Sequence, residues 1–281
     1  MIKKFLLIVG MLFVSVSAFG ANCEYTCVEP HDLNNGLRTF VSKVSGLNFI
    51  GTKIGESILK KSISKVVQSD KNLKVNIDSY SARDLKRGIF KSMTISGENV
   101  NIEGIYLSYF ELKTLCEFNY VEYDKKGDLK FKEDLPMSFD IKMTADDINN
   151  SMKSDRYQKV INDVNKLGFG GIRVSSTSVS IRGNKFYYVV NIAIPFVKEK
   201  KIEITADINV KNGKIDFENT RLTSSSFKLD LKKIDFIMNY LNPLDFSVYI
   251  FDNKDAKVYI KNIAIKNNVI TTDGIIVVQK D

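Results

Sequence analysis

The sequence predicts an α+β fold in which a long, curved antiparallel sheet wraps around a few amphipathic helices. Many short segments alternate apolar and polar residues, as strands with one buried face do. Short turns marked by glycine or asparagine join these segments, which favours antiparallel pairing. Stretches with helical spacing are few, too few for the crossovers that a parallel sheet requires. The 281 residues include only 4 prolines and no glycine- or serine-rich linker, which indicates one continuous domain.

The amino terminus has the pattern of a secretory signal peptide. Lys3–Lys4 form a basic start, Phe5–Val16 is an apolar core, and Ala18–Gly20 places small residues at the −3 and −1 positions of a cleavage site. The apolar run is short for a membrane-spanning helix, although retention as an inner-membrane anchor is the alternative. Asn22 before Cys23 argues against a lipoprotein. We expect a signal peptide at 1–20, an N-terminal segment with the CEYTC motif at 21–44, and a single domain at 45–281.

Helical spacing first occurs at residues 48–69. The segment carries an apolar stripe at three- and four-residue intervals, with lysines largely off that face. A strand follows at 74–80. The stripe consists of Ile50, Ile54, Ile58, Ile63, Val66 and Val67.

The segment Arg87–Lys113 reads as paired strands with glycine-marked turns. Met93 and Ile95 point to one face, and Ser92 and Thr94 to the other. The same alternation predicts that Ile105, Leu107 and Tyr109 share a face.

A second helix is predicted directly after the alternating strand at 137–143. Thr144 is a suitable N-cap, with Asp147 as its capping-box partner, and Gly168 ends the helix. Its apolar stripe is Ile148, Met152, Val160, Ile161, Val164 and Leu167.

Strands return at 188–194 and 202–210, and Asn212–Gly213 gives a hairpin signal before the next strand. A third helix is predicted near 231–241, ended by Asn242–Pro243. The last strands lie near 258–265.

The formal net charge is +8. Removal of Lys3–Lys4 with the leader leaves 39 basic residues against 33 acidic ones, a net charge of +6. This excess either serves solubility or attracts an anionic membrane surface, where each Lys or Arg contributes about 1 kcal/mol. A nucleic-acid partner is not expected, because the basic residues are dispersed.

The three cysteines are Cys23, Cys27 and Cys116. Export permits disulfides. We expect Cys23 and Cys27 to pair within CEYTC and Cys116 to stay free inside a strand. The alternative, a metal site at CxxxC, would have no histidine partner beyond His31.

Residues for catalysis are sparse. His31 is the one histidine, and it lies in a polar stretch near the mature N-terminus. The glycines at 168–171 are not followed by the Lys-Ser/Thr of a P-loop. Asp146 and Asp147 fall in the first turn of a predicted helix, where capping explains them better than paired acid–base chemistry. We therefore expect no enzyme, no cofactor and no metal site.

Three short motifs follow one another along the chain: residues 88–107, with GIFKSMTI, NV and GIYL in order, the helix entry MTADDIN at 143–149, and the turn VKNGKI at 210–215. Together they resemble the LmeA-like phospholipid-binding family. The resemblance covers roughly residues 45–278. It implies an exported, non-catalytic envelope protein that binds phospholipid, and a fold similar to tubular lipid-binding domains. The CEYTC segment lies outside the family pattern, and the family's lipid-contacting residues do not carry over.

An apolar cleft between sheet and helices would take its walls from the apolar stripes, although each such residue is equally a core residue. The sequence is compatible with three functional classes. They are a lipid-binding or lipid-transport module for envelope biogenesis, an interaction or assembly factor with a closed core, and an unrecognised hydrolase. The lipid-contacting candidates are Ile50, Ile54, Ile58, Ile105, Leu107, Ile234, Ile237 and Leu241.

Overall fold

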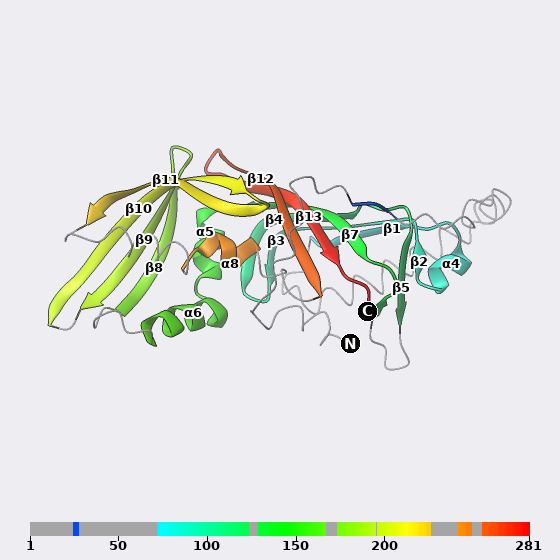
Figure 1. The fold of residues 1–281 in the computed structure, drawn as a ribbon, viewed down its shortest axis with the longest axis horizontal. Coiled ribbons are helices and arrows are strands. Elements are labelled where there is room, and N and C mark those ends of the chain that lie inside the picture. Colours follow the sequence, from blue (N-terminus) through cyan, green and yellow to red (C-terminus); the bar gives the residue numbers. More distant parts are fainter. Residues whose placement is uncertain are drawn as a thin grey trace.

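The computed structural model describes seven parts of the chain, and antiparallel strands dominate them (Figure 1). The coarse prediction, an α+β fold rich in antiparallel sheet, is confirmed. The predicted helix at 48–69 and residues 231–240 of the third predicted helix lie outside the described parts. The described residues are 25–27, 72–123, 129–166, 173–194, 196–225, 241–248 and 255–281.

A six-stranded sheet forms the middle of the molecule, and its strand order is β1-β3-β4-β7-β13-β12. Every neighbouring pair in it is antiparallel. The strands are β1 (Lys74–Asp78), β3 (Ser92–Ile102), β4 (Ile105–Thr114), β7 (Leu135–Met143), β12 (Ala256–Lys266) and β13 (Val269–Val278).

A four-stranded antiparallel sheet continues the molecule at one end, in the order β11-β10-β9-β8. The alternation predicted for 188–194 and 202–210 is borne out, since Tyr188, Val190, Ile202 and Ile204 are buried. The strands are β8 (Arg173–Arg182), β9 (Lys185–Ile194), β10 (Val197–Lys211) and β11 (Lys214–Ser225).

A small three-stranded sheet, β2-β5-β6, lies at the opposite end beside a short helix (Figure 1). The elements are β2 (Ile89–Phe90), β5 (Asn119–Tyr123), β6 (Leu129–Phe131) and α4 (Ala82–Lys86).

Three further helices stand near the meeting point of the two larger sheets (Figure 1). The first packs on β4 and β8, and the second on β8. They are α5 (Ala145–Ser151), α6 (Asp155–Lys166) and α8 (Pro243–Val248).

The second predicted helix is two helices. Thr144 caps α5 as expected, with both hydrogen bonds of the capping box to Asp147 present. The helix ends at Ser151, and α6 begins at Asp155 after Ser154, whose carbonyl accepts the N–H of Gln158. The apolar stripe runs in phase across the break, so periodicity alone predicted one helix.

Asn242–Pro243 begins the helix α8, and residues 231–240, where the third helix was predicted to precede it, lie outside the described parts. The Asn242 side chain accepts the N–H of Leu244 at 3.0 Å, and its carbonyl accepts the N–H of Phe246 at 3.2 Å. Asn is a favoured N-cap, and proline is favoured at the first helical position.

The predicted alternation in β4 fails at Tyr109. Ile105 and Leu107 are buried, but the next fully buried residue is Phe110. The change occurs where Asn99 of the neighbouring β3 takes a left-handed conformation, with φ of 51°. Tyr109 instead lies under the ammonium of Lys142, 4.9 Å from the ring centre.

The two larger sheets meet at the tip of the β10–β11 hairpin. The predicted Asn212–Gly213 turn is confirmed, and both residues have positive φ. The Gly213 carbonyl accepts the N–H of Ile260 in β12 at 3.0 Å, beside an irregularity between Ile260 and Asn262. The hairpin tip thus rests on β12, the outermost strand of the six-stranded sheet.

Candidate functional site

One face of the six-stranded sheet is apolar from β1 to β12. The strand register aligns its side chains in rows that cross the sheet, and most of them are buried. Two neighbouring rows hold one polar side chain, that of Thr114, and its hydroxyl accepts the N–H of Met93 at 3.0 Å. One row is Val75, Ile95, Leu112, Phe139, Gly274 and Ile260, and the next is Ile77, Met93, Thr114, Met137, Ile276 and Val258.

Two aromatic rings of this sheet lie close against glycines. A Cβ on Gly97 would be 2.7 Å from the Phe110 ring, and one on Gly274 would be 2.7 Å from the Phe139 ring. Each glycine is the cross-strand partner of its ring. The missing side chain leaves room for the ring, which in turn covers the exposed backbone. On this face of the sheet, the two aromatic rings therefore pack directly on the backbone of the neighbouring strand.

Polar contacts fix α5 on this sheet. The Ser108 hydroxyl of β4 donates to the Asp147 carboxylate, which also accepts the backbone N–H of Thr144 at 2.8 Å. At the end of the helix, the Ser151 hydroxyl accepts the N–H of Tyr106 at 2.8 Å. Asp147 therefore caps a helix and anchors it to a strand, as the capping interpretation of this carboxylate predicted.

Asn149 ties the same helix to the four-stranded sheet. Its side-chain oxygen accepts the N–H of Val179 at 2.7 Å, and its side-chain nitrogen donates to the carbonyl of Val179 at 2.9 Å. Such a two-bond contact satisfies one residue of β8 completely. It holds the two larger sheets at a fixed distance from α5.

The structure places three of the eight lipid-contacting candidates. Ile105, Leu107 and Leu241 belong to one hydrophobic cluster, with exposed fractions of 1%, 2% and 0%. The other five, Ile50, Ile54, Ile58, Ile234 and Ile237, lie outside the described residues. All three described candidates lie in the interior. A lipid-binding cleft lined by these residues requires this position, and a closed hydrophobic core would place them there as well.

A buried polar centre lies beside Leu241. The hydroxyls of Tyr157 and Tyr188 are 2.9 Å apart, and they lie 2.8 and 2.9 Å from the Leu241 carbonyl oxygen. Burial raises the pKa of both phenols, that of Tyr188 well above its usual value. Both therefore stay protonated and serve as hydrogen-bond donors. They join α6 and β9 to the start of α8.

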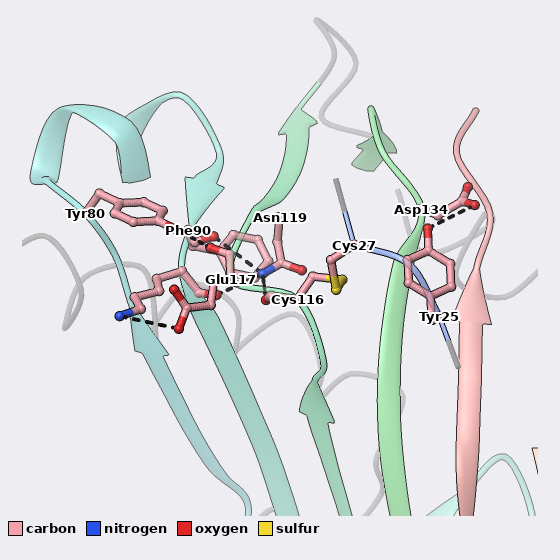
Figure 2. The surroundings of a disulfide bond; sticks show 9 residues. Tyr25, Cys27, Tyr80, Phe90, Cys116, Glu117, Asn119 and Asp134 are labelled. Atoms are coloured by element: carbon pink, nitrogen blue, oxygen red, sulfur yellow. Dashed lines mark hydrogen bonds and ion pairs between the residues drawn. A yellow bond between two sulfur atoms is a disulfide. The ribbon is translucent and has the colours of Figure 1, made fainter. Parts of the chain in front are cut away.

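The disulfide contradicts the predicted pairing of Cys23 with Cys27. Cys27 is bonded to Cys116, across a sequence separation of 89 residues (Figure 2). Cys116, expected to be a free thiol, is 5% exposed. The expected pairing rested on short spacing, whereas the fold brings the segment 25–27 alongside the end of β4. Three cysteines allow three pairings, and spacing alone does not choose among them.

Asn119 organises the chain next to this bond. It is fully buried, and its side-chain nitrogen donates to the carbonyls of Cys116 at 2.9 Å and Lys91 at 3.0 Å (Figure 2). Close by, the Tyr80 hydroxyl donates to the carbonyl of Glu117 at 2.6 Å. The loop that carries Cys116 is thus held from two sides independently of the disulfide.

The segment 25–27 reaches beyond the disulfide to the start of β7. The Tyr25 hydroxyl donates to the Asp134 carboxylate at 3.3 Å (Figure 2). Burial, followed by the charge of Asp134, raises the pKa of Tyr25 to about 12. The Asp134 carboxylate also accepts the N–H of Lys280 at 2.9 Å. An early and a late part of the chain are therefore joined at one end of the sheet.

The opposite face of the sheet carries a row of carboxylates. Glu111, Asp140 and Asp273 are successive cross-strand neighbours on β4, β7 and β13. Burial raises the pKa of Asp140, Lys142 opposes the shift, and the charges of Asp273 and Glu111 add to it. Like charges directly opposite each other destabilise a sheet. This row is an electrostatic cost of the fold at neutral pH.

Within the described parts of the chain, no group of three or more His, Cys, Asp or Glu side chains is arranged to hold a metal ion. Among the helices in those same parts, none is long and apolar enough to cross a membrane.

Comparison with known proteins gives no relative: no family model, curated protein or solved structure matches this chain.

Proposed function

We propose that the protein is exported and binds phospholipid through its apolar interior, in support of lipid handling or envelope construction and without catalysis. The resemblance of its motifs to the LmeA-like family and the secretory pattern of residues 1–20 both point this way. In this proposal the sheet curves around its helices as in tubular lipid-binding domains. Phospholipid is the ligand, and an anionic membrane surface is the place where it is exchanged.

The observation that carries the proposal is the predominantly apolar face of the six-stranded sheet. Rows of Ile, Val, Leu, Met and Phe side chains cross all six strands without a charged residue. Burial of one CH₂ group contributes about 0.8 kcal/mol in a bilayer or in an apolar pocket. Transfer of an acyl chain between the two can therefore be nearly neutral in free energy.

A second candidate function is an interaction or assembly factor of the envelope with a closed core and no lipid. The near-complete burial of Ile105, Leu107 and Leu241 favours it. The two proposals differ in what fills the space beside these three side chains.

Native mass spectrometry of protein purified gently from its own envelope distinguishes the two candidates. Lipid binding predicts adducts of phospholipid mass, and uptake of lipid from added vesicles by protein that has been stripped. Wild-type protein that carries no phospholipid and takes none up would refute the proposal and leave the interaction factor.

Leu107→Ala tests the location of the lipid. In a closed core this truncation costs about 2–5 kcal/mol. Beside an acyl chain we expect a smaller loss, reduced further when phospholipid is added, because a ligand stabilises the state that binds it. Ile204→Ala is the matched control, since Ile204 is equally buried but lies in the four-stranded sheet. The stability that this control loses relative to wild type should be the same with and without lipid.

A further inference from the structure

Phe196 is the most exposed large apolar residue in the described parts of the chain. Its relative exposure is 108%, so its ring is fully open to solvent. Strands β9 and β10 pair at Ile194 and Val197, which leaves only residues 195 and 196 to connect them. The ring is therefore carried at the very tip of a hairpin. Figure 1 shows this tip at the free end of the four-stranded sheet, far from the contact with β12.

The backbone of Phe196 is also unusual. Its φ is 63°, in the left-handed region that a bulky side chain rarely adopts. The other described non-glycine residues with positive φ are asparagines, apart from Glu103. Asparagine tolerates this conformation, and glycine is the usual residue there in a two-residue turn. The turn thus has a strained aromatic residue at a kind of position where the described parts of the chain mostly use asparagine.

Basic residues follow directly behind the ring. Lys198, Lys200 and Lys201 lie within five residues of Phe196, with Glu199 as the one acid among them. Glu199 accepts a hydrogen bond from the Ser175 hydroxyl of β8. Arg173, exposed at the start of β8, pairs with Ala193 near the same end of the sheet. The tip therefore combines an exposed aromatic ring with basic residues close to it in the chain.

The spacing matches the layers of a bilayer. A strand rises about 3.3 Å per residue, so Lys200 stands roughly 13 Å behind Phe196 along the chain. Apolar groups of peripheral proteins enter about 5–10 Å into the boundary between headgroups and acyl chains. With Phe196 at that depth, Lys200 lies outside the apolar layer, at the level of the headgroups. Cations there gain from an anionic surface.

We infer that the β9–β10 tip is a membrane-docking wedge, in which Phe196 enters the interface of an anionic phospholipid bilayer and Lys200 behind it contacts lipid phosphates. This inference goes beyond the proposed function, because it concerns attachment to a membrane surface and not the lipid held inside. It also explains the strained aromatic residue, whose burial in lipid offsets the cost of its conformation. Strained positions of this kind are retained where they serve a function.

The absence of tryptophan from the chain makes a direct test possible. Phe196→Trp places a single fluorophore at the tip, and Leu115→Trp places one at an exposed position beside Cys116 as a matched control. On vesicles of phosphatidylcholine and phosphatidylglycerol, the emission of Phe196→Trp should move to shorter wavelength and be quenched by brominated acyl chains. The control should show neither effect. An unchanged Phe196→Trp emission on these vesicles would overturn the inference.

Phe196→Asn tests the energetics, since asparagine keeps the turn conformation and removes the ring. The full chain with this change should bind the same vesicles about tenfold more weakly in a sedimentation assay. Its thermal stability should be equal to or above that of wild type, which excludes unfolding as the cause. Lys200→Gln should weaken vesicle binding more at low salt than at high salt, because salt screens the attraction between this lysine and lipid phosphates. Equal binding of Phe196→Asn and wild type would refute the wedge.

Two further readouts separate the explanations. A shift of Phe196→Trp emission with protein concentration, without vesicles, would mean that the tip contacts a second copy of the chain, and would overturn the membrane assignment. Lipid held inside the protein is measured separately by native mass spectrometry of Phe196→Asn. Retained lipid with lost vesicle binding supports both proposals, and vesicle binding without any internal lipid supports the wedge alone.

Discussion

Replacement of both Cys27 and Cys116 by alanine removes the bond that closes a loop across 89 residues. In the chain-entropy model, a loop of this length makes the unfolded state less favourable by about 4–5 kcal/mol, against roughly 2 kcal/mol for the short Cys23–Cys27 loop. Alanine is used because serine would bury a hydroxyl at position 116. We therefore expect the double variant to lose about 4–5 kcal/mol of unfolding free energy.

Urea denaturation followed by circular dichroism measures this loss, with Cys23→Ala as the control. The control should unfold at the same urea concentration as wild type. The hydrogen bonds of Asn119 remain in the double variant, so we expect it to fold to the same structure. A loss below about 2 kcal/mol, or an equal loss in Cys23→Ala, would contradict the reasoning.

Thiol alkylation gives an independent check. Without reductant and after unfolding in urea, one cysteine should be labelled, and peptide mapping should identify it as Cys23. Labelling of Cys116 instead would restore the pairing within CEYTC and show that the bond to Cys27 does not form.

Three more predictions follow from the fold and the sequence. Gly274→Ala should lower the unfolding free energy measured in urea by about 3 kcal/mol, because its Cβ would lie 2.1 Å from the backbone oxygen of Tyr259, which cannot move aside as a side chain could. The control is Gly183→Asn. No atom lies within 4 Å of a Cβ at that position, so this change should alter stability by less than about 0.5 kcal/mol. Asp140→Asn should raise the melting temperature at pH 7. The pKa of Asp140 is higher in the folded than in the unfolded state, so wild type loses stability as the pH rises through the carboxyl range. At acidic pH the wild-type carboxyl is protonated, so the advantage of the variant should vanish there. The intact mass of exported protein should correspond to cleavage near Gly20, and a mass that includes the leader would indicate a membrane anchor.

Features fixed by neighbouring residues were predictable from the sequence. The alternation in β10, the capping box of Thr144 and Asp147, and the Asn212–Gly213 turn all depend on residues a few positions apart. Their physical causes are local: the two-residue period of a strand, the unpaired N–H groups at a helix start, and the left-handed conformation of a tight turn. These predictions hold because tertiary contacts reinforce them.

Features fixed by distant parts of the chain were not predictable. The pairing of Cys27 with Cys116 depends on how the N-terminal segment crosses the sheet, and no local pattern records that path. The burial of Phe110 in place of Tyr109 follows from a left-handed residue in the neighbouring strand. The candidate site shows the same limit, since alternation identified Ile105 and Leu107 as inward-facing without revealing what they contact.

The hairpin tip resting on β12 has a consequence for the behaviour of the chain in crowded surroundings. The outermost strand of a sheet offers a template to which another chain can add by backbone pairing, a common route to aggregation. Here the Gly213 carbonyl occupies the N–H of Ile260 midway along that strand, and the adjacent irregularity bends the template. The hairpin precedes β12 in the chain, so the hairpin can form before the strand whose edge it covers. Loss of the tip should therefore increase aggregation during folding.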